Sequence, residues 1–334
     1  MTLQTDQADQ AGPSSARAAG RGGATEGTGD AVAAGDGADV DASPSVAVRL
    51  RGATLGYGGH PVVGPEQPVD LDLPAGKTTA IIGANGCGKS TLLRGLTRQL
   101  PLTSGSLDVF GRSTEGWGSR SYARTVALLP QSPVVPEGMT VEQLVDRGRH
   151  PHRGWFGARS AQDTRAIAQA LELADLVSLA GRDVAELSGG QRQRAWLALV
   201  LAQQTPVVLL DEPTSYLDLS HQVELMDLIK ALPDPTGTRP RATVVAVLHE
   251  LNLAGRSADH IVAMAGGQIV AQGSPREVLT PENLHAIYGL DADVVHDPLL
   301  GHPVVLPRTQ SDRAAGLSHG PVAGPAAGPS PKHS

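Results

Sequence analysis

Residues Lys77–Arg94 read KTTAIIGANGCGKSTLLR, and this stretch decides how the chain folds. A short apolar run leads into a glycine-rich turn and then into a helix-forming segment, which predicts strand, turn and helix in that order. Within it, Gly83, Gly88, Lys89 and Ser90 fit the phosphate-loop pattern G-x-x-x-x-G-K-[ST]. A chance glycine-rich turn is the alternative, and the strand before it and the helix after it argue against that.

The residue types of this turn suit a phosphate group. Glycines lack a Cβ, so the backbone can take up positive φ and approach a ligand closely. Successive N–H groups then converge on an anion, and the helix that begins near Lys89 adds the positive end of its dipole. In this arrangement Lys89 supplies a point charge to the β- and γ-phosphates, and the Ser90 hydroxyl is a ligand for Mg²⁺.

The composition favours a soluble cytosolic protein with an aliphatic core. The chain has 334 residues, a formal net charge of −7, 40% hydrophobic residues and 3% aromatic residues. Its one cysteine, Cys87, rules out an internal disulfide and favours a reducing compartment. No apolar run approaches the ~18 residues that span a bilayer, and no signal peptide is recognisable. The mild acidity argues against nucleic acid as a partner.

Both ends of the chain lack the large apolar residues that build a core. Residues 1–45 are mostly Ala, Gly, Asp and Ser, and residues 308–334 are rich in Gly, Ala, Pro and His. Such segments cannot bury enough surface to offset the entropy lost on ordering, so we expect both to be disordered. The folded domain is therefore expected over residues 46–307.

An antiparallel β subdomain is expected at the start of the folded part. Val46–Tyr57 and Val69–Leu73 alternate apolar and polar residues, as half-buried strands do. They lead into a buried strand at Thr78–Ile82. After the phosphate loop, the helix is expected to run to about Gln99, and Leu107–Phe110 reads as a further strand.

Residues 134–194 are expected to form a helical insertion in this α/β fold. Two capping-box pairs, Thr140–Gln143 and Ser160–Asp163, indicate helix starts. The second precedes Ala161–Leu173, which carries apolar residues at helical spacing. Between the two starts, residues 147–157 (RGRHPHRGWFG) predict a polar loop with an aromatic pair.

Two later strands end in polar residues. Pro206–Leu210 is a continuous run of β-branched residues and leucine, typical of a central parallel strand, and Asp211 and Glu212 follow it. Thr243–Leu248 is another buried strand, and His249 follows that one. The sequence also predicts a helix over residues 220–232, a hairpin over 261–271, two short helices opening at Ser274 and Thr280, and a terminal hairpin over 294–305.

The motifs after the phosphate loop indicate a family. Leu187–Gln191 reads LSGGQ and Val207–Glu212 reads VVLLDE. Gln131 follows a strand expected at 125–129, and His249 follows the strand expected at 243–248. In this order the residues resemble the nucleotide-binding subunit of an ABC transporter, over about residues 46–306. The resemblance implies an α/β fold with a P-loop NTPase (RecA-like) core, an N-terminal antiparallel β subdomain and an inserted helical subdomain. It also implies an enzyme that hydrolyses ATP.

The resemblance assigns the catalytic roles. Glu212 matches the carboxylate that polarises the attacking water, and His249 matches the histidine that contacts the γ-phosphate. Gln131 matches the residue that senses the γ-phosphate and links the core to the helical insertion. Ser90, Gln131 and Asp211 are the expected contacts of Mg²⁺, with Asp211 acting through water. Read alone, the acidic pair is a strand-end cap and the histidine a structural residue.

The family pattern also implies two chains packed head to tail. Tyr57 matches the aromatic residue that stacks on adenine, although an ordinary strand-end tyrosine is the alternative. LSGGQ does not fit the nucleotide of its own subunit, so Ser188 and the backbone of Gly189 and Gly190 would face the γ-phosphate held by the other chain. The loop Ser215–Asp218 would contact that chain as well. The residues expected to contact nucleotide are Tyr57, Gly83, Ala84, Asn85, Gly86, Cys87, Gly88, Lys89, Ser90, Thr91, Ser188, Gly189, Gly190, Gln191 and Asp218.

Three stretches resemble the importer ATPases for ferric siderophores. They are Gly148–His152 (GRHPH), Asp211–Gln222 (DEPTSYLDLSHQ) and Val247–Ala254 (VLHELNLA). This likeness implies integral membrane permease subunits as partners, and indirectly an extracytoplasmic substrate-binding protein. It also implies a peripheral location on the cytoplasmic face of the membrane, with the permease docked near residues 147–157.

Other functions remain open. Cobalamin and haem importers share parts of the pattern and are the nearest alternative. A soluble ABC ATPase without a transport role usually carries two cassettes or a long coiled coil, and this sequence has one cassette and no heptad run. A phosphate-loop kinase would have no use for LSGGQ.

Cys87 stands inside the phosphate loop. The helix dipole and the charge of Lys89 are expected to favour its thiolate. Alkylation of the thiol would then block ATP binding, and ATP would protect it. A small residue that fills the loop is the alternative.

The Glu212→Gln variant should bind ATP normally and turn over more slowly, by a factor on the order of 10², as expected for the loss of one preorganised catalytic group. Nucleotide affinity and phosphate release measured on the same preparation test this. Turnover at the wild-type rate would remove the proposed role of Glu212.

Overall fold

The computed structural model describes residues 45–309 and 311, apart from residue 132 and residues 134–136, 155–156, 216 and 233–240. The ends expected to be disordered, residues 1–45 and 308–334, therefore lie almost entirely outside the described residues. No helix in the described part of the chain combines the length and apolar character needed to cross a membrane.

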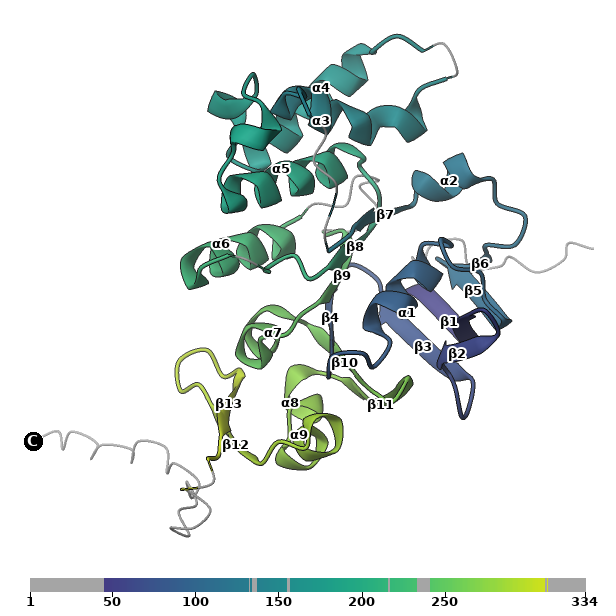
Figure 1. The fold of residues 1–334 in the computed structure, drawn as a ribbon, viewed down its shortest axis with the longest axis vertical. Coiled ribbons are helices and arrows are strands. Elements are labelled where there is room, and N and C mark those ends of the chain that lie inside the picture. The colour runs from purple at the N-terminus through teal and green to yellow at the C-terminus, as the bar shows by residue number, and fades with distance from the viewer. Residues whose placement is uncertain are drawn as a thin grey trace, which may run out of the picture. The chain divides into compact units, whose positions relative to one another are not determined.

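A six-stranded sheet forms the centre of the fold (Figure 1). Its order is β11-β10-β4-β9-β8-β7, and all neighbours pair in parallel except the edge pair β10 and β11. Every residue of β4, β8 and β9 is buried, as both faces of a central parallel strand require. The strands are β4 (Thr78–Gly83), β7 (Val126–Leu129), β8 (Val207–Asp211), β9 (Thr243–Val247), β10 (His260–Ala265) and β11 (Gln268–Gly273).

The expected antiparallel subdomain is present and is built around β1 (Val46–Tyr57). β1 pairs with β2 (His60–Val63), β3 (Val69–Pro74) and β5 (Ser104–Val109), and β5 pairs with a two-residue strand, β6 (Arg112–Ser113). Sequence reasoning missed β2, because three of its four residues are not buried and it shows no alternation.

Helix α1 (Lys89–Leu96) follows the phosphate loop, and it ends earlier than the expected Gln99. Thr97 caps it, and Arg98 has a positive φ of 58°, which ends the helix. The Arg98 guanidinium lies 5.1 Å from the centre of the Tyr122 ring, so this residue makes a tertiary contact just beyond the helix. In Figure 1, α1 and the antiparallel sheet lie on one side of the central strands, and α6 and α7 lie on the other.

The inserted helical subdomain contains α3 (Val141–Asp146), α4 (Ala161–Leu173) and α5 (Gly189–Ala202). Both expected capping boxes are confirmed at α3 and α4. The polar loop expected over residues 147–157 is wrong in part, because Arg147–His152 forms a 3₁₀ helix with Arg149 buried. Asp163, which lies on α4, supplies the charge that allows this burial. The aromatic pair at 155–156 lies outside the described residues.

The predicted hairpin, the two short helices and the terminal hairpin of the C-terminal part are confirmed. The terminal hairpin is formed by β12 (Ala292–His296) and β13 (Pro303–Pro307). Sequence reasoning missed α2 and α7, which have five and seven residues. The remaining helices are α2 (Ser119–Ala123), α6 (Leu219–Lys230), α7 (Leu251–Ser257), α8 (Pro275–Val278) and α9 (Pro281–Tyr288), with short 3₁₀ helices at Val177–Leu179 and Val184–Glu186.

Truncating a side chain on β8 should weaken the whole sheet. Leu209 is 0% exposed between the central sheet and the antiparallel subdomain, so Leu209→Ala should lower the free energy of unfolding by about 2–5 kcal/mol. Val270→Ala, at a position that is 45% exposed on edge strand β11, is the matched control and should change it by less than about 0.5 kcal/mol. Urea unfolding followed by circular dichroism measures both, and equal effects would contradict the assigned core.

Candidate functional site

The predicted site residues follow four neighbouring strands of the central sheet. β4, β9, β8 and β7 lie side by side and run parallel, so their carboxyl ends meet at one edge. The phosphate loop follows β4, His249 follows β9, Glu212 follows β8, and Gln131 comes just after β7. Ligands of open α/β sheets bind at such an edge.

Glycine is required in the phosphate loop where the backbone is crowded. A Cβ on Gly83 would lie 2.3 Å from the backbone oxygen of Met264 and 2.7 Å from the Cys87 sulfur. Gly88 has a positive φ of 104° at the cap of α1 and has no side chain to bond the first N–H groups of the helix. These N–H groups and the helix dipole therefore make the start of α1 a suitable place for an anion.

Lys89 is folded back over the loop. Its side chain is buried, and Nζ donates to the backbone oxygens of Gly83 at 2.8 Å and Ala84 at 3.0 Å. An ammonium group has three donors, so one is left for a phosphate oxygen. The loop therefore holds a positive charge beside the helix start, although contact with nucleotide stays a prediction.

Ser90 and Asp211 form the candidate metal site. The Ser90 hydroxyl donates to Asp211 Oδ1 at 3.2 Å. Burial raises the pKa of Asp211, the Ser90 hydrogen bond lowers it, and the nearby Glu212 charge raises it further, with a net increase. Hydroxyl and carboxylate oxygens suit Mg²⁺, so the residues fit this ion. Within the described residues no three His, Cys, Asp or Glu side chains gather as a metal site, so phosphate and water oxygens would complete the coordination.

Glu212 lies at the centre of a hydrogen-bonded cluster. Gln131 Nε2 donates to its Oε2 at 2.6 Å, Ser215 Oγ donates to the same oxygen at 3.1 Å, and His249 Nε2 lies 2.7 Å from Oε1. Burial raises the pKa of Glu212, but hydrogen bonds from His249, Ser215 and Gln131 outweigh it and lower the pKa. Gln131 and His249 thus each contact Glu212 directly, and the catalytic roles of all three residues stay predictions.

The backbone of Glu212 adopts an uncommon conformation. Its φ is 53°, in the left-handed region that non-glycine residues rarely occupy. The chain turns sharply here, and Ser215 N donates to the backbone oxygen of Glu212 at 3.2 Å. Sequence reasoning missed the contact of Ser215 with the Glu212 carboxylate. The spacing of three residues across a turn is the signal that could have revealed it.

Tyr57 stands at the end of β1 with 44% of its surface exposed. Arg94 of α1 donates to its hydroxyl oxygen at 3.1 Å, which fixes the ring next to the helix that follows the phosphate loop. The exposed ring face suits a planar base, and stacking on adenine stays a prediction.

The LSGGQ residues lie elsewhere, at the start of α5. Ser188 is its N-cap, and Ser188 and Gln191 form a capping box with N···O distances of 3.3 and 3.1 Å. Figure 1 shows α5 beside α3 and α4, separate from α1 and the phosphate loop. Asp218 caps α6 and accepts hydrogen bonds from Ser220 and His221.

The prediction that the loop favours the Cys87 thiolate is wrong, because the pKa of this thiol is raised and not lowered. Its side chain is 7% exposed and packs against the backbone near Gly83. Burial raises the pKa of the thiol, and the opposing effects of the Lys89 charge and backbone hydrogen bonds are smaller. The thiolate is therefore disfavoured in the folded chain.

Folded Cys87 should consequently react slowly. With iodoacetamide at neutral pH, we expect slower labelling than in the urea-unfolded chain, and a rate that rises only at higher pH than for a free thiol. Mass spectrometry of timed samples across pH gives both rates. Labelling of the folded chain at or above the unfolded rate would contradict the raised pKa.

Comparisons with known sequences agree with this geometry. The family model "ABC transporter" matches residues 67–215. The probable siderophore transport system ATP-binding protein YusV of Bacillus subtilis is 42% identical over 82% of this chain and 98% of its own length. The ferric enterobactin transport ATP-binding protein FepC of Escherichia coli is 45% identical over 78% of this chain and 94% of its own length. A cobalamin import ATP-binding protein of Halobacterium salinarum is 39% identical over 74% of this chain and 61% of its own length.

Solved structures agree as well. A putative metal-chelate type ABC transporter in an inward-facing conformation is 28% identical, with a TM-score of 0.67 over 80% of this chain and 99% of that chain. A dimeric bacterial ABC transporter cassette is 25% identical, with a TM-score of 0.58 over 68% of this chain and 98% of that chain. On the strength of relatives that match over nearly their whole length, this chain belongs to the family of ABC transporter ATP-binding proteins.

Proposed function

We propose that this chain is the ATP-binding subunit of an importer and that it hydrolyses ATP to drive uptake of ferric siderophores across the cytoplasmic membrane. The observation that carries the proposal is the contact of Glu212 with Gln131 and His249 at the sheet edge that also bears the phosphate loop. Similarity along nearly the full length of two siderophore-transport ATP-binding proteins supports the choice of cargo.

Binding of ATP uses the start of α1. The backbone N–H groups of the loop and Lys89 surround the β- and γ-phosphates, and Tyr57 stacks on the adenine ring. Ser90, and Asp211 through water, would hold Mg²⁺, which would neutralise phosphate charge. This arrangement places the γ-phosphate next to the ends of β7, β8 and β9, where the polar cluster lies.

Hydrolysis depends on a change of partners at Glu212. Gln131 Nε2 and His249 Nε2 both contact its carboxylate. When the γ-phosphate arrives, its oxygens compete for these two donors, and Glu212 becomes able to orient a water molecule. That water attacks in line and breaks the bond between the γ-phosphorus and the β–γ bridging oxygen, which yields ADP and phosphate. Because its lowered pKa keeps Glu212 ionised, it can accept a hydrogen bond from the water.

Two copies complete the site. Ser188–Gly190 at the start of α5 contact the γ-phosphate held by the partner chain, and Ser215–Asp218 face the same interface. ATP then joins the two chains, and hydrolysis removes the bridging charge. Permease subunits in the membrane receive this closing motion through the helical subdomain near residues 147–157. An extracytoplasmic binding protein delivers the cargo, and the chain is peripheral on the cytoplasmic face.

A cobalamin or haem importer is the second candidate. The similarity to the cobalamin import protein of Halobacterium salinarum favours it. The two siderophore-transport relatives are more similar over a larger share of the chain, and they support the first candidate. The ATPase subunit need not touch the cargo, so its own residues do not select between these substrates.

Uptake of radiolabelled ferric siderophores tests the proposal. Cells that lack this chain should take up less label, and the wild-type chain should restore uptake. Glu212→Gln should not restore it, whereas the matched control Glu172→Gln, at an exposed position on α4, should.

Two results would contradict the proposal. One is rescue by Glu212→Gln. The other is unchanged siderophore uptake on deletion in cells shown to have no second importer. A fall in cobalamin or haem uptake instead would select the second candidate.

A further inference from the structure

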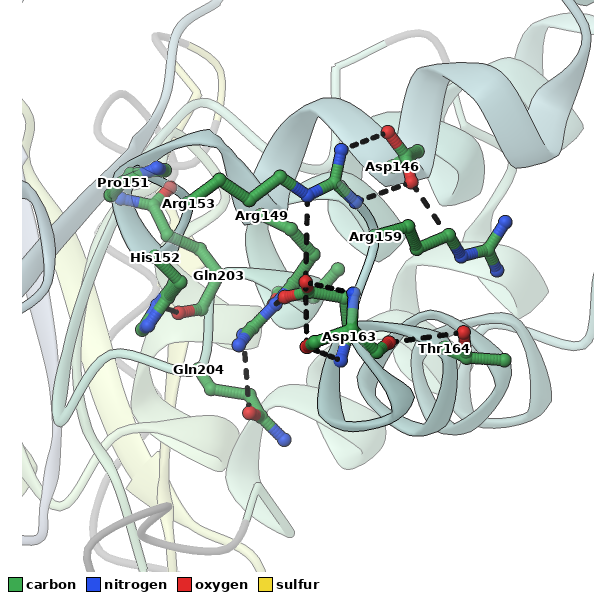
Figure 2. Close-up of polar contacts among 12 residues, drawn as sticks. Asp146, Arg149, Pro151, His152, Arg153, Arg159, Asp163, Thr164, Gln203 and Gln204 are labelled. Atoms are coloured by element: carbon green, nitrogen blue, oxygen red, sulfur yellow. Dashed lines mark hydrogen bonds and ion pairs between the residues drawn. The ribbon is translucent and has the colours of Figure 1, made fainter. Parts of the chain in front are cut away.

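The largest fully buried side chain among the described residues belongs to an arginine outside the nucleotide site. Arg149 is 1% exposed, and its Nε donates to Asp163 Oδ1 at 2.8 Å. Its Nη1 donates to the backbone oxygen of Ala202 at 2.7 Å and to Gln204 Oε1 at 3.1 Å (Figure 2). A charge removed from water is unfavourable unless it is paired and hydrogen-bonded, and these contacts meet that requirement.

The partners of Arg149 mark the ends of two helices. Asp163 lies in the first turn of α4, and its carboxylate also accepts hydrogen bonds from Ser160 N at 2.9 Å and Ser160 Oγ at 2.8 Å. Ala202 is the last residue of α5, where backbone oxygens have no partner within the helix and a cation is favourable. Arg149 therefore joins the start of α4 to the end of α5.

Neighbours of Arg149 contact the same end of α5. A Cβ on Gly148 would lie 2.2 Å from the backbone oxygen of Leu199, so the segment packs against the helix at a distance that only glycine allows. His152 Nε2 lies 2.7 Å from the backbone oxygen of Gln203. The 3₁₀ helix Arg147–His152 thus fits closely against the last turn of α5.

This end of α5 is also fixed to the core. Arg124 Nε donates to the backbone oxygen of Pro151 at 2.8 Å, and Gln203 Nε2 donates to that of Ala123 at 2.5 Å. Ala123 and Arg124 lie close before β7, separated from its first residue, Val126, by Thr125 alone, and this strand leads to Gln131. The contacts of Arg149 are therefore tied to the sheet that carries the nucleotide site.

The other end of α5 carries Ser188–Gly190. The helix has 14 residues, which gives a length of about 21 Å at ~1.5 Å per residue. A small tilt at its last turn therefore displaces the LSGGQ turn. We infer that Arg149 is a positioning residue, which fixes the end of α5 and so sets where Ser188–Gly190 lie when two chains close on ATP. The inference rests on the proposed role of that turn in the dimer.

Arg149→Met tests this in the full-length chain. The affinity of the single chain for ATP should not change, because the contacts of Arg149 do not involve the phosphate loop. ATP-dependent dimerisation in the Glu212→Gln background should weaken, and turnover in the otherwise wild-type chain should fall by about tenfold or more, since small misplacements of a catalytic contact have effects of this size. Arg159→Met is the matched control, because Arg159 is an arginine of the same subdomain whose ion pair with Glu142 is solvent-exposed.

A second variant separates positioning from stability. Arg149→Met removes the closer of the two cationic partners of buried Asp163 and leaves only Arg153, whose Nε lies 3.5 Å from Asp163 Oδ2, which lowers the melting temperature. Adding Asp163→Asn removes this poorly compensated buried charge and keeps an acceptor for Ser160, while Arg153 keeps its ion pair with Asp146 at 2.6 Å, so the melting temperature should recover toward wild type. The contact with Ala202 stays absent, so turnover should stay low.

The outcomes are distinct. Turnover that recovers together with the melting temperature would show that Arg149 only stabilises the subdomain, and it would overturn the inference. So would an Arg149→Met chain that matches Arg159→Met in turnover and dimerisation. Ser188→Arg serves as the reference. If it leaves dimerisation and turnover intact, the proposed role of the LSGGQ turn fails, and the inference fails with it.

Discussion

The candidate site depends on the parallel pairing of β4, β9, β8 and β7. Parallel neighbours end at the same edge, and this brings together groups that are far apart in the sequence. The contact of Gln131 with Glu212 spans 81 positions, and that of Ser90 with Asp211 spans 121. In the phosphate loop, the backbone at Gly83 packs where no Cβ would fit. Because this loop follows β4, it lies at the same sheet edge as the polar cluster around Glu212.

Two adjacent carboxyl groups at this edge have opposite electrostatic environments. Burial raises the pKa of Asp211, and hydrogen bonds from His249, Ser215 and Gln131 lower that of Glu212 against the effect of burial. Glu212 is therefore the carboxylate that stays ionised most readily, which suits a group that orients water. Its partners Gln131 and His249 are hydrogen-bond donors, and in the proposed mechanism a γ-phosphate competes with the Glu212 carboxylate for them.

Local patterns in the sequence predicted much of the fold. The phosphate loop, the capping boxes of α3 and α4 and the fully buried strand β8 depend on residues close in the chain, and all three are present. Contacts between distant residues were harder to foresee. Arg149 reads as part of a polar loop, because its partners lie 14 and 53 positions away. Arg98 takes a positive φ and its guanidinium lies beside the Tyr122 ring, which is 24 positions away. Cys87 was assigned a favoured thiolate because burial cannot be read from the loop motif alone.

The central claim is that one chain binds ATP at the phosphate loop and a second chain completes the site. An experimental structure of the Glu212→Gln chain with ATP and Mg²⁺ tests it most directly. The account predicts a head-to-tail dimer in which Lys89, Gln131 and His249 of one chain and Ser188–Gly190 of the other contact the same γ-phosphate. A γ-phosphate contacted by one chain alone, with the LSGGQ turn facing solvent, would contradict it.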